Sequence, residues 1–207
     1  MKRLDRVIVT LVAVNFVWFG FRIYFVSHAP LKRITSVSSL DVIGDVANLS
    51  GDSKAGLVIV EFGDYQCPPC ARMVIEVEQF MRRNKGKFRF NFRQYPLPSH
   101  SYALPAAMLA ERARKYGKFE AVHKSLFALQ ANLNEDSLKV IARSYGLKYS
   151  SGDNLDVDDK VYETIVAADK LMGNKIPVIA TPSLFLCTAD NKVFQLYDVG
   201  QAGEFLK

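Results

Sequence analysis

The sequence predicts an α/β fold in which a long helical region interrupts the sheet, and three observations lead to this prediction. An apolar run over residues 57–62 ends shortly before the dithiol motif C-P-P-C at residues 67–70. Residues 88–95 alternate between apolar and polar side chains, which is the period of a half-buried strand. The roughly 85 residues between Tyr95 and Pro182 have helical periodicity, and an apolar strand follows them.

The N-terminus carries a long apolar segment. Residues 7–26 are almost all apolar, and as a helix these about twenty residues would span a bilayer core of about 30 Å. We expect residues 1–26 to form an uncleaved signal anchor, that is, a transmembrane helix, and a cleaved signal peptide is the alternative. Residues 27–53 then form a tether with some local structure, and residues 54–207 form the α/β domain. An export element with a dithiol implies an oxidising, extracytoplasmic compartment such as the periplasm.

Charge gives no support to nucleic-acid binding. The 207 residues carry a net charge of +6, and residues 1–33 account for +5 of it, with six cations against Asp5. These cations are Lys2, Arg3, Arg6, Arg22, Lys32 and Arg33. The rest of the chain is nearly neutral, so it offers no basic surface to a polyanion.

The motif lies between two predicted strands. Residues 57–62 read as a buried strand, and residues 88–95 as a strand with alternating faces. From Pro68 to about Asn84 the apolar side chains recur at helical spacing. Proline suits the first helical turn, where N–H groups have no intrahelical partner. The motif therefore begins a helix.

The remaining elements are four helices and a hairpin. Helices are expected over residues 103–116, 119–130, from a cap at Asn134 to Gly146, and over 156–172 with Gly173 as the C-terminal stop, all within an insertion of about 99–173. Their apolar stripes are interpreted as core packing, with His123 as surface or partly buried packing. Strands over residues 183–187 and 193–197 form the terminal hairpin.

Two cysteines separated by two residues at a helix N-terminus can hold a redox-active disulfide. The helix dipole and unpaired N–H groups there lower the pKa of a thiol, and the thiolate is the attacking species. The alternative is half of a zinc site, which needs four ligands. Only Cys187, His28, His100 and His123 remain, and they lack ligand-like spacing. We therefore predict redox chemistry with no metal and no cofactor besides the Cys67–Cys70 disulfide; Cys187 is expected to be a buried, inert thiol.

In its motifs and their order, the chain resembles the DsbA-like branch of the thioredoxin superfamily. The matching stretches are V-E-F-G-D-Y-Q-C-P-P-C at 60–70, F-R-Q-Y-P-L-P at 92–98, the Ala-rich segment 101–113 and A-T-P-S at 180–183. The resemblance covers roughly residues 54–200, and this ordered combination is more specific than a lone C-x-x-C. It implies a thioredoxin-like fold with an inserted helical subdomain.

The resemblance also implies roles for five residues. Cys67 is the expected nucleophile and Cys70 the resolving thiol. Glu61 stands where such proteins place a buried carboxylate, which could relay protons to and from Cys70; an exposed strand-end acid is the alternative. Pro182 is the expected cis-proline beside the dithiol, and Thr181 would offer backbone groups to a substrate strand.

The implied function is an extracytoplasmic thiol–disulfide oxidoreductase that exchanges disulfides with exported proteins. Oxidase or general exchange activity is favoured over a reductase or an isomerase, with a membrane protein as the redox partner. Pro69 stands where strongly oxidising members usually have histidine, so we expect a less acidic Cys67 and a less oxidising couple. A non-enzymatic binding or chaperone module and a metal carrier are the other classes left open.

Overall fold

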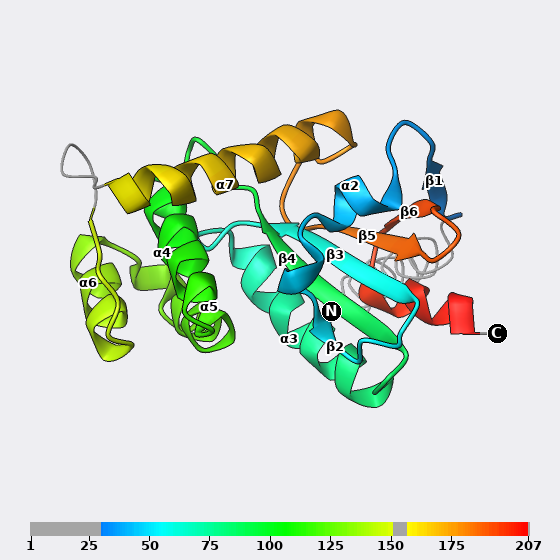
Figure 1. Cartoon of the computed structure of the whole chain (residues 1–207), viewed down its shortest axis with the longest axis horizontal. Coiled ribbons are helices and arrows are strands. Elements are labelled where there is room, and N and C mark those ends of the chain that lie inside the picture. Colours follow the sequence, from blue (N-terminus) through cyan, green and yellow to red (C-terminus); the bar gives the residue numbers. More distant parts are fainter. Residues whose placement is uncertain (1–29, 151–156, 207) are drawn as a thin grey trace, which may run out of the picture.

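The sheet is mixed and has six strands in the order β1-β6-β5-β3-β4-β2. The computed structural model describes residues 30–150 and 157–206 (Figure 1). Its strands are β1 (Lys32–Ile34), β2 (Ser50–Gly51), β3 (Leu57–Gly63), β4 (Phe88–Gln94), β5 (Ser183–Thr188) and β6 (Val193–Leu196). β3 pairs with β4 in parallel, and every other pair is antiparallel. The apolar run of β3 is therefore central, as its buried composition predicts.

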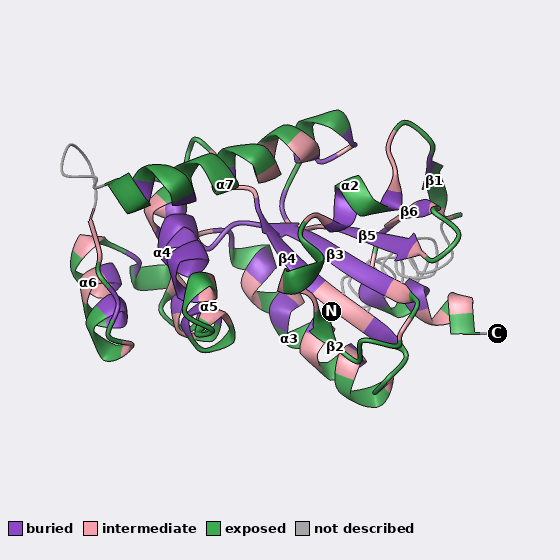
Figure 2. Ribbon diagram, in the orientation of Figure 1, coloured by how far each residue is buried: buried purple, intermediate pink, exposed green. Residues whose placement is uncertain are grey.

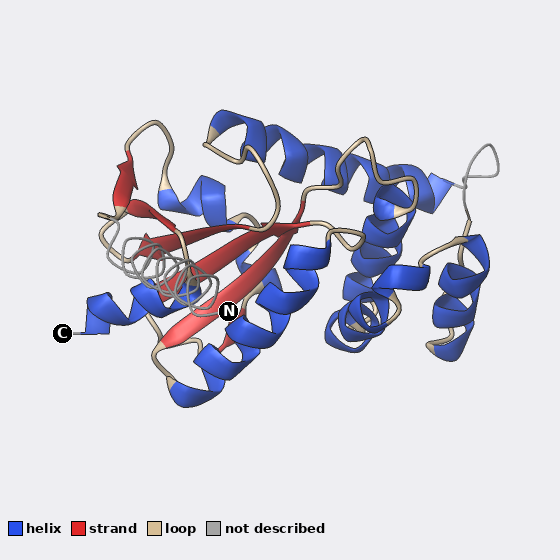
Figure 3. Cartoon of the chain, turned by 180° about the vertical axis from the view of Figure 1, so that it is seen from behind, coloured by secondary structure: helices blue, strands red, loops and turns tan. Residues whose placement is uncertain are grey.

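Helices cover both faces of the sheet and extend past its end. The α-helices are α2 (Ser39–Ile43), α3 (Pro68–Arg83), α4 (Ala103–Lys115), α5 (Phe119–Ala128), α6 (Glu135–Ser144) and α7 (Val157–Lys175), and the 3₁₀ helices are η1 (Val46–Asn48), η2 (Gln130–Asn132) and η4 (Val199–Leu206). In Figures 1 and 3, α4, α5 and α6 lie beyond one end of the strands, and α7 runs back over the sheet. The predicted insertion is thus a set of helices that come between β4 and β5 in the sequence.

Successive side chains of β3 point to opposite faces of the sheet, so they pack in different apolar clusters. Val58, Val60 and Phe62 pack in one apolar cluster with Val42 of α2. Ile59 points the other way and packs with α3 and η4. Figure 2 shows the resulting band of buried residues along β3 and β5. Because side chains alternate in a strand, Glu61 shares the face of Ile59 and is directed toward α3.

Residues 32–51 differ from the tether that we expected over 27–53, because they contribute strands and a helix to the domain. β1 pairs with β6, and β2 pairs with β4. The Nδ2 group of Asn91 donates a 2.8 Å hydrogen bond to the carbonyl oxygen of Ile43, and Arg93 Nη1 donates one of 2.6 Å to that of Asp41. Each element is too short to give a periodic signal, so tertiary contacts rather than local propensity fix this segment.

Helix α7 corrects one predicted boundary. It continues to Lys175, so Gly173 lies inside the helix and is not its C-terminal stop. A Cβ atom at this position would lie 2.6 Å from a ring carbon of Tyr95 and 3.4 Å from one of Phe62. The glycine therefore permits close packing of α7 on the sheet.

The predicted transmembrane segment, residues 1–26, lies outside the described residues. Within residues 30–150 and 157–206, no helix is both long enough and apolar enough to span a bilayer. The predicted start of the last insertion helix at residue 156 also falls outside the described part of the chain.

Candidate active site

The two motif cysteines occupy different depths at the start of α3. Cys67 is the N-cap residue with extended backbone (φ −83°, ψ 112°), and the prolines form the first helical turn. The Cys70 N–H donates a 2.9 Å hydrogen bond to the Cys67 carbonyl oxygen. Cys67 retains 6% exposure, whereas Cys70 has none. Both are free thiols. A substrate sulfur can therefore reach Cys67 but not Cys70 without rearrangement.

Asp64 organises the turn that carries Cys67. Its carboxylate is wholly buried and accepts hydrogen bonds from the backbone N–H of Gln66 at 2.6 Å and of Leu97 at 2.7 Å. His100 Nδ1 lies 2.8 Å from the same carboxylate. The Asp64 carbonyl oxygen also accepts from the Cys67 N–H at 3.1 Å. These bonds tie the β3–α3 turn to the loop after β4 and fix the position of the dithiol.

The loop before β5 brings Thr181 and Pro182 to the dithiol. The Thr181–Pro182 peptide bond is cis, as the resemblance implied. The Cys67 thiol donates a 3.1 Å hydrogen bond to the Thr181 carbonyl oxygen, although 114 residues separate the two in sequence. The Thr181 hydroxyl is buried and has no hydrogen-bond partner among the described residues. The two predicted residues and Cys67 thus share one site.

Glu61 is buried, which excludes the exposed strand-end alternative. It lies in β3 opposite Leu184 and Phe92, and neither carboxyl oxygen has a hydrogen-bond partner in the described part of the chain. Burial, with a smaller effect from the charge of Glu76, raises the pKa of Glu61 to about 8. A Cβ atom on Gly63 would lie 2.4 Å from a ring carbon of Phe92 and 3.1 Å from Glu61 Oε1, so this glycine leaves space for both side chains.

Glu61 affects the ionisation of Cys70. Burial raises the pKa of the Cys70 thiol, and the negative charge of Glu61 raises it further. Among the described residues neither Glu61 oxygen forms a hydrogen bond with the Cys70 sulfur. Proton exchange between the carboxyl group and this thiol would therefore need a bridging group such as water.

Gln130, which was not predicted from the sequence, reaches the dithiol from the helical insertion. Its Nε2 group donates a 2.6 Å hydrogen bond to the Cys67 carbonyl oxygen from the 3₁₀ helix η2. That carbonyl also accepts from the Cys70 N–H. Gln130 stands 63 residues after Cys67, and no local pattern marks it. Only the packing of the insertion on α3 places it at the site.

His123 is buried, which corrects our expectation of surface or partly buried packing. Its Nδ1 lies 2.9 Å from the Tyr65 hydroxyl oxygen, and rings of Phe92, Phe119 and Phe127 surround it. Burial, then the charges of Arg114 and Lys124, lower the pKa of His123 to about 3. The imidazole is therefore neutral at physiological pH.

Cys187 does not join the site. It lies fully buried in β5 in the cluster with Val58 and Val193, on the other face of the sheet from Ile59. Burial raises the pKa of Cys187 to about 12, so the thiol is unreactive. Within the described residues no group of three or more His, Cys, Asp and Glu side chains could hold a metal ion.

Known proteins resemble this chain in sequence or in fold. One curated relative is the Na⁺/H⁺ antiporter NhaA 1 of Mycobacterium sp. (strain KMS), which is 30% identical over 166 residues, or 79% of this chain and 26% of that protein. The chain thus spans about a quarter of the length of the curated relatives that it matches.

This chain also matches solved structures over most of their length. A thioredoxin-like oxidoreductase from Silicibacter pomeroyi DSS-3 is 25% identical, has a TM-score of 0.63, and the match covers 81% of this chain and 94% of that one. The thiol-disulfide exchange protein alpha-DsbA2 from Wolbachia pipientis, 21% identical with a TM-score of 0.62, shares the fold over 80% of this chain and 90% of its own. Residues 45–197 match the thioredoxin family model. The chain therefore belongs to the thioredoxin family, and its structural neighbours are DsbA-like oxidoreductases of the thioredoxin fold.

Proposed function

We propose that this protein is a thiol–disulfide oxidoreductase in which Cys67 exchanges with substrate and Cys70 resolves the intermediate. The observation that carries the proposal is the unequal setting of the two thiols. Cys67 is the outer thiol at the helix N-terminus, and Cys70 is fully buried. On the same side of the sheet lies the Glu61 carboxyl group, which has no hydrogen-bond partner among the described residues. Redox-active dithiols need such a division between an attacking and a resolving sulfur.

In the reducing direction, the Cys67 thiolate attacks one sulfur of a substrate disulfide. The substrate S–S bond breaks, one half leaves as a thiolate that takes up a proton, and a mixed disulfide with Cys67 remains. Cys70 then loses its proton and attacks the Cys67 sulfur, which releases the second substrate thiol. Two electrons pass from the dithiol to the substrate, and the oxidising direction reverses these steps.

Glu61 supplies the proton transfer that Cys70 needs. A buried thiol is a poor nucleophile until a base takes its proton, and a buried thiolate leaves poorly until an acid protonates it. A carboxyl group with a pKa of about 8 can serve as either near neutral pH. The Thr181 carbonyl, already bonded to the Cys67 thiol, lies where an extended substrate segment would pair with the loop.

Oxidation or general exchange on exported proteins is the proposed physiological direction. Supporting this are residues 1–26, proposed here as a membrane anchor because residues 7–26 are almost all apolar, and the tendency of disulfide chemistry to operate in oxidising compartments. We further propose that the domain lies in the periplasm or an equivalent extracytoplasmic space. Exported proteins with thiols or disulfides would be its substrates, and a membrane protein would restore its redox state.

The reduction potential of the full chain, equilibrated in detergent with defined thiol buffers, tests the direction. A value between about −120 and about −180 mV supports oxidation or general exchange, and one near about −270 mV indicates a reductase instead. If Cys67 and Cys70 never exchange with the buffer, the redox proposal fails and a binding module is the better account.

A further inference from the structure

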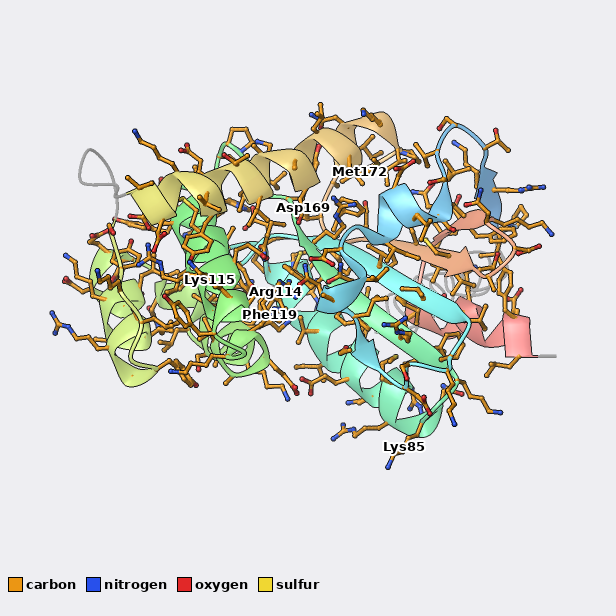
Figure 4. All side chains as sticks on the ribbon, viewed as in Figure 1. Lys85, Arg114, Lys115, Phe119, Asp169 and Met172 are labelled. Atoms are coloured by element: carbon orange, nitrogen blue, oxygen red, sulfur yellow. The ribbon has the colours of Figure 1, made fainter. Side chains whose placement is uncertain are left out.

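A groove lies between α3, β4 and α5, away from the dithiol. Its volume is about 820 Å³, within the range of roughly 300–1,000 Å³ typical of small-molecule sites. Neither Cys67 nor Cys70 lines it. Figure 4 labels two of its lining residues, Phe119 at the start of α5 and Lys85 just past the end of α3.

Aromatic and aliphatic side chains line one part of this groove. Phe88, Phe90 and Phe92 line it from β4, because alternate side chains of a strand share one face. The other apolar side chains are Val74, Val77 and Met81 of α3 and Phe119 of α5. Such a lining packs well against a flat aromatic ring, by offset or edge-on contact.

His123 offers the groove one polar atom, the ring nitrogen Nε2. The side chain lines the groove and retains only 6% exposure. Its Nδ1 is taken by the Tyr65 hydroxyl, and Tyr65 is not a lining residue. Among the described residues the ring forms a hydrogen bond through Nδ1 alone, and its other nitrogen, Nε2, is not one of the fully buried atoms that lack a partner. Nε2 is therefore the atom that the ring can offer to a bound molecule, as donor or acceptor according to the tautomer.

The charges around the groove cancel. Three cations, Arg82, Lys85 and Lys124, stand against three carboxylates, Asp52, Glu78 and Glu120. Lys124 Nζ lies 3.2 Å from Glu78 Oε1 and 3.0 Å from Glu120 Oε1, and so bridges α3 and α5. A charged ligand would meet both signs, and the burial of an unpaired charge is unfavourable. Charge balance therefore favours an uncharged occupant.

We propose that this groove binds a small, uncharged aromatic molecule that carries one hydroxyl or carbonyl group. Its ring packs on the phenylalanine side chains, and its polar group forms a hydrogen bond with His123 Nε2. Neither motif cysteine lines this groove, so ligand binding here and thiol–disulfide exchange at Cys67 can be tested independently.

Three probes of one shape test the proposal: p-cresol with a hydroxyl, toluene with none, and p-toluate with a carboxylate. The full chain in detergent is titrated with each probe while NMR follows the His123 ring and the groove backbone, which separates binding from uptake by micelles. We expect p-cresol to shift these signals, with toluene about five- to tenfold weaker because it lacks one hydrogen bond. p-Toluate should also bind more weakly than p-cresol.

Other results would overturn the proposal. Equal affinities for p-cresol and toluene exclude a hydrogen bond to His123, and tighter binding of p-toluate excludes an uncharged ligand. Unshifted groove signals with every probe remove the site.

A pair of variants locates the site. Met81→Trp should fill the groove and abolish the p-cresol shifts while thiol–disulfide exchange continues. Ile75→Trp is the matched control, because Ile75 lies on the same helix, is 58% exposed and does not line the groove. If Met81→Trp and Ile75→Trp bind p-cresol equally well, the probe binds elsewhere.

Discussion

The Cys67 thiol donates a 3.1 Å hydrogen bond to the carbonyl oxygen of Thr181, which belongs to the cis peptide before Pro182. This contact joins the start of α3 to the loop before β5. Whatever approaches the Cys67 sulfur must therefore pass beside the Thr181 backbone. Under the proposed function, this relationship would bring thiol exchange and the recognition of an extended substrate to the same point of the molecule.

Glu61→Gln should slow the steps that need proton transfer to or from Cys70. The amide keeps the shape of the carboxyl group but cannot accept the thiol proton, so we expect a loss of about tenfold or more in the rate of resolution near pH 7. Stopped-flow measurement of mixed-disulfide decay reports this step. Glu163→Gln, at an exposed position of α7, is the control. Equal rates in wild type and Glu61→Gln would exclude the proton relay.

The same buried carboxyl group should make stability depend on pH. Its pKa is about 8 in the folded protein against 4.5 for the ordinary side chain, so the folded state holds the proton more tightly. The stability that protonated Glu61 contributes is therefore fully present below about pH 4.5, and it is lost as the pH rises toward about 8. Denaturation of wild type and Glu61→Gln from pH 4 to 9 measures this effect. Across that window the unfolding free energy of Glu61→Gln should rise relative to that of wild type, by on the order of a few kcal/mol. If the difference in unfolding free energy between the two proteins does not change with pH, the burial argument is wrong.

Gln130→Leu should weaken the link between the helical insertion and the dithiol. It removes the 2.6 Å hydrogen bond to the Cys67 carbonyl oxygen and costs about 1 kcal/mol of unfolding free energy. The reduction potential should shift as well, because the bond orders the turn that holds Cys67. Gln79→Leu, an exposed position on α3, should change neither quantity. A Gln130→Leu protein with unaltered stability and potential would show that the bond has no such role.

Gly173→Ala should destabilise the packing of α7 on the sheet. The added methyl group would lie 2.6 Å from the Tyr95 ring, so we expect a cost of about 1–3 kcal/mol despite the better helix propensity of alanine. At Gly203 a Cβ atom meets nothing within 4 Å, so Gly203→Ala is the matched control. Urea denaturation compares the two. A stabilised Gly173→Ala protein would mean that Tyr95 moves aside without cost.

Local patterns were sufficient to predict the central strands of the sheet and the start of the helix that carries the dithiol. Leu57–Gly63 and Phe88–Gln94 have the composition or alternation of strands, and the motif prolines mark the start of α3. The burial of Glu61 and the cis peptide at Pro182 followed from the resemblance. These features are encoded within short windows or in an ordered motif, so sequence reasoning could find them.

Features that depend on distant contacts were missed. Gln130 and His123 lie on amphipathic segments whose pattern shows which face is buried but not which side chain meets Cys67 or Tyr65. Gly173 looked like a helix end because glycine often is one, and only the approach of Tyr95 reveals its packing role. In each case the partner is at least 58 residues away in sequence.

Trapping of the mixed disulfide shows which cysteine attacks the substrate and so tests the proposed roles of Cys67 and Cys70. Reduced Cys70→Ser protein is incubated with insulin as the disulfide substrate, and adducts are mapped by mass spectrometry. The account predicts a stable adduct through Cys67 in Cys70→Ser, none in Cys67→Ser, and wild-type exchange in Cys187→Ser. An adduct through Cys187, or no adduct in Cys70→Ser under conditions where a simple dithiol reduces insulin, would contradict it.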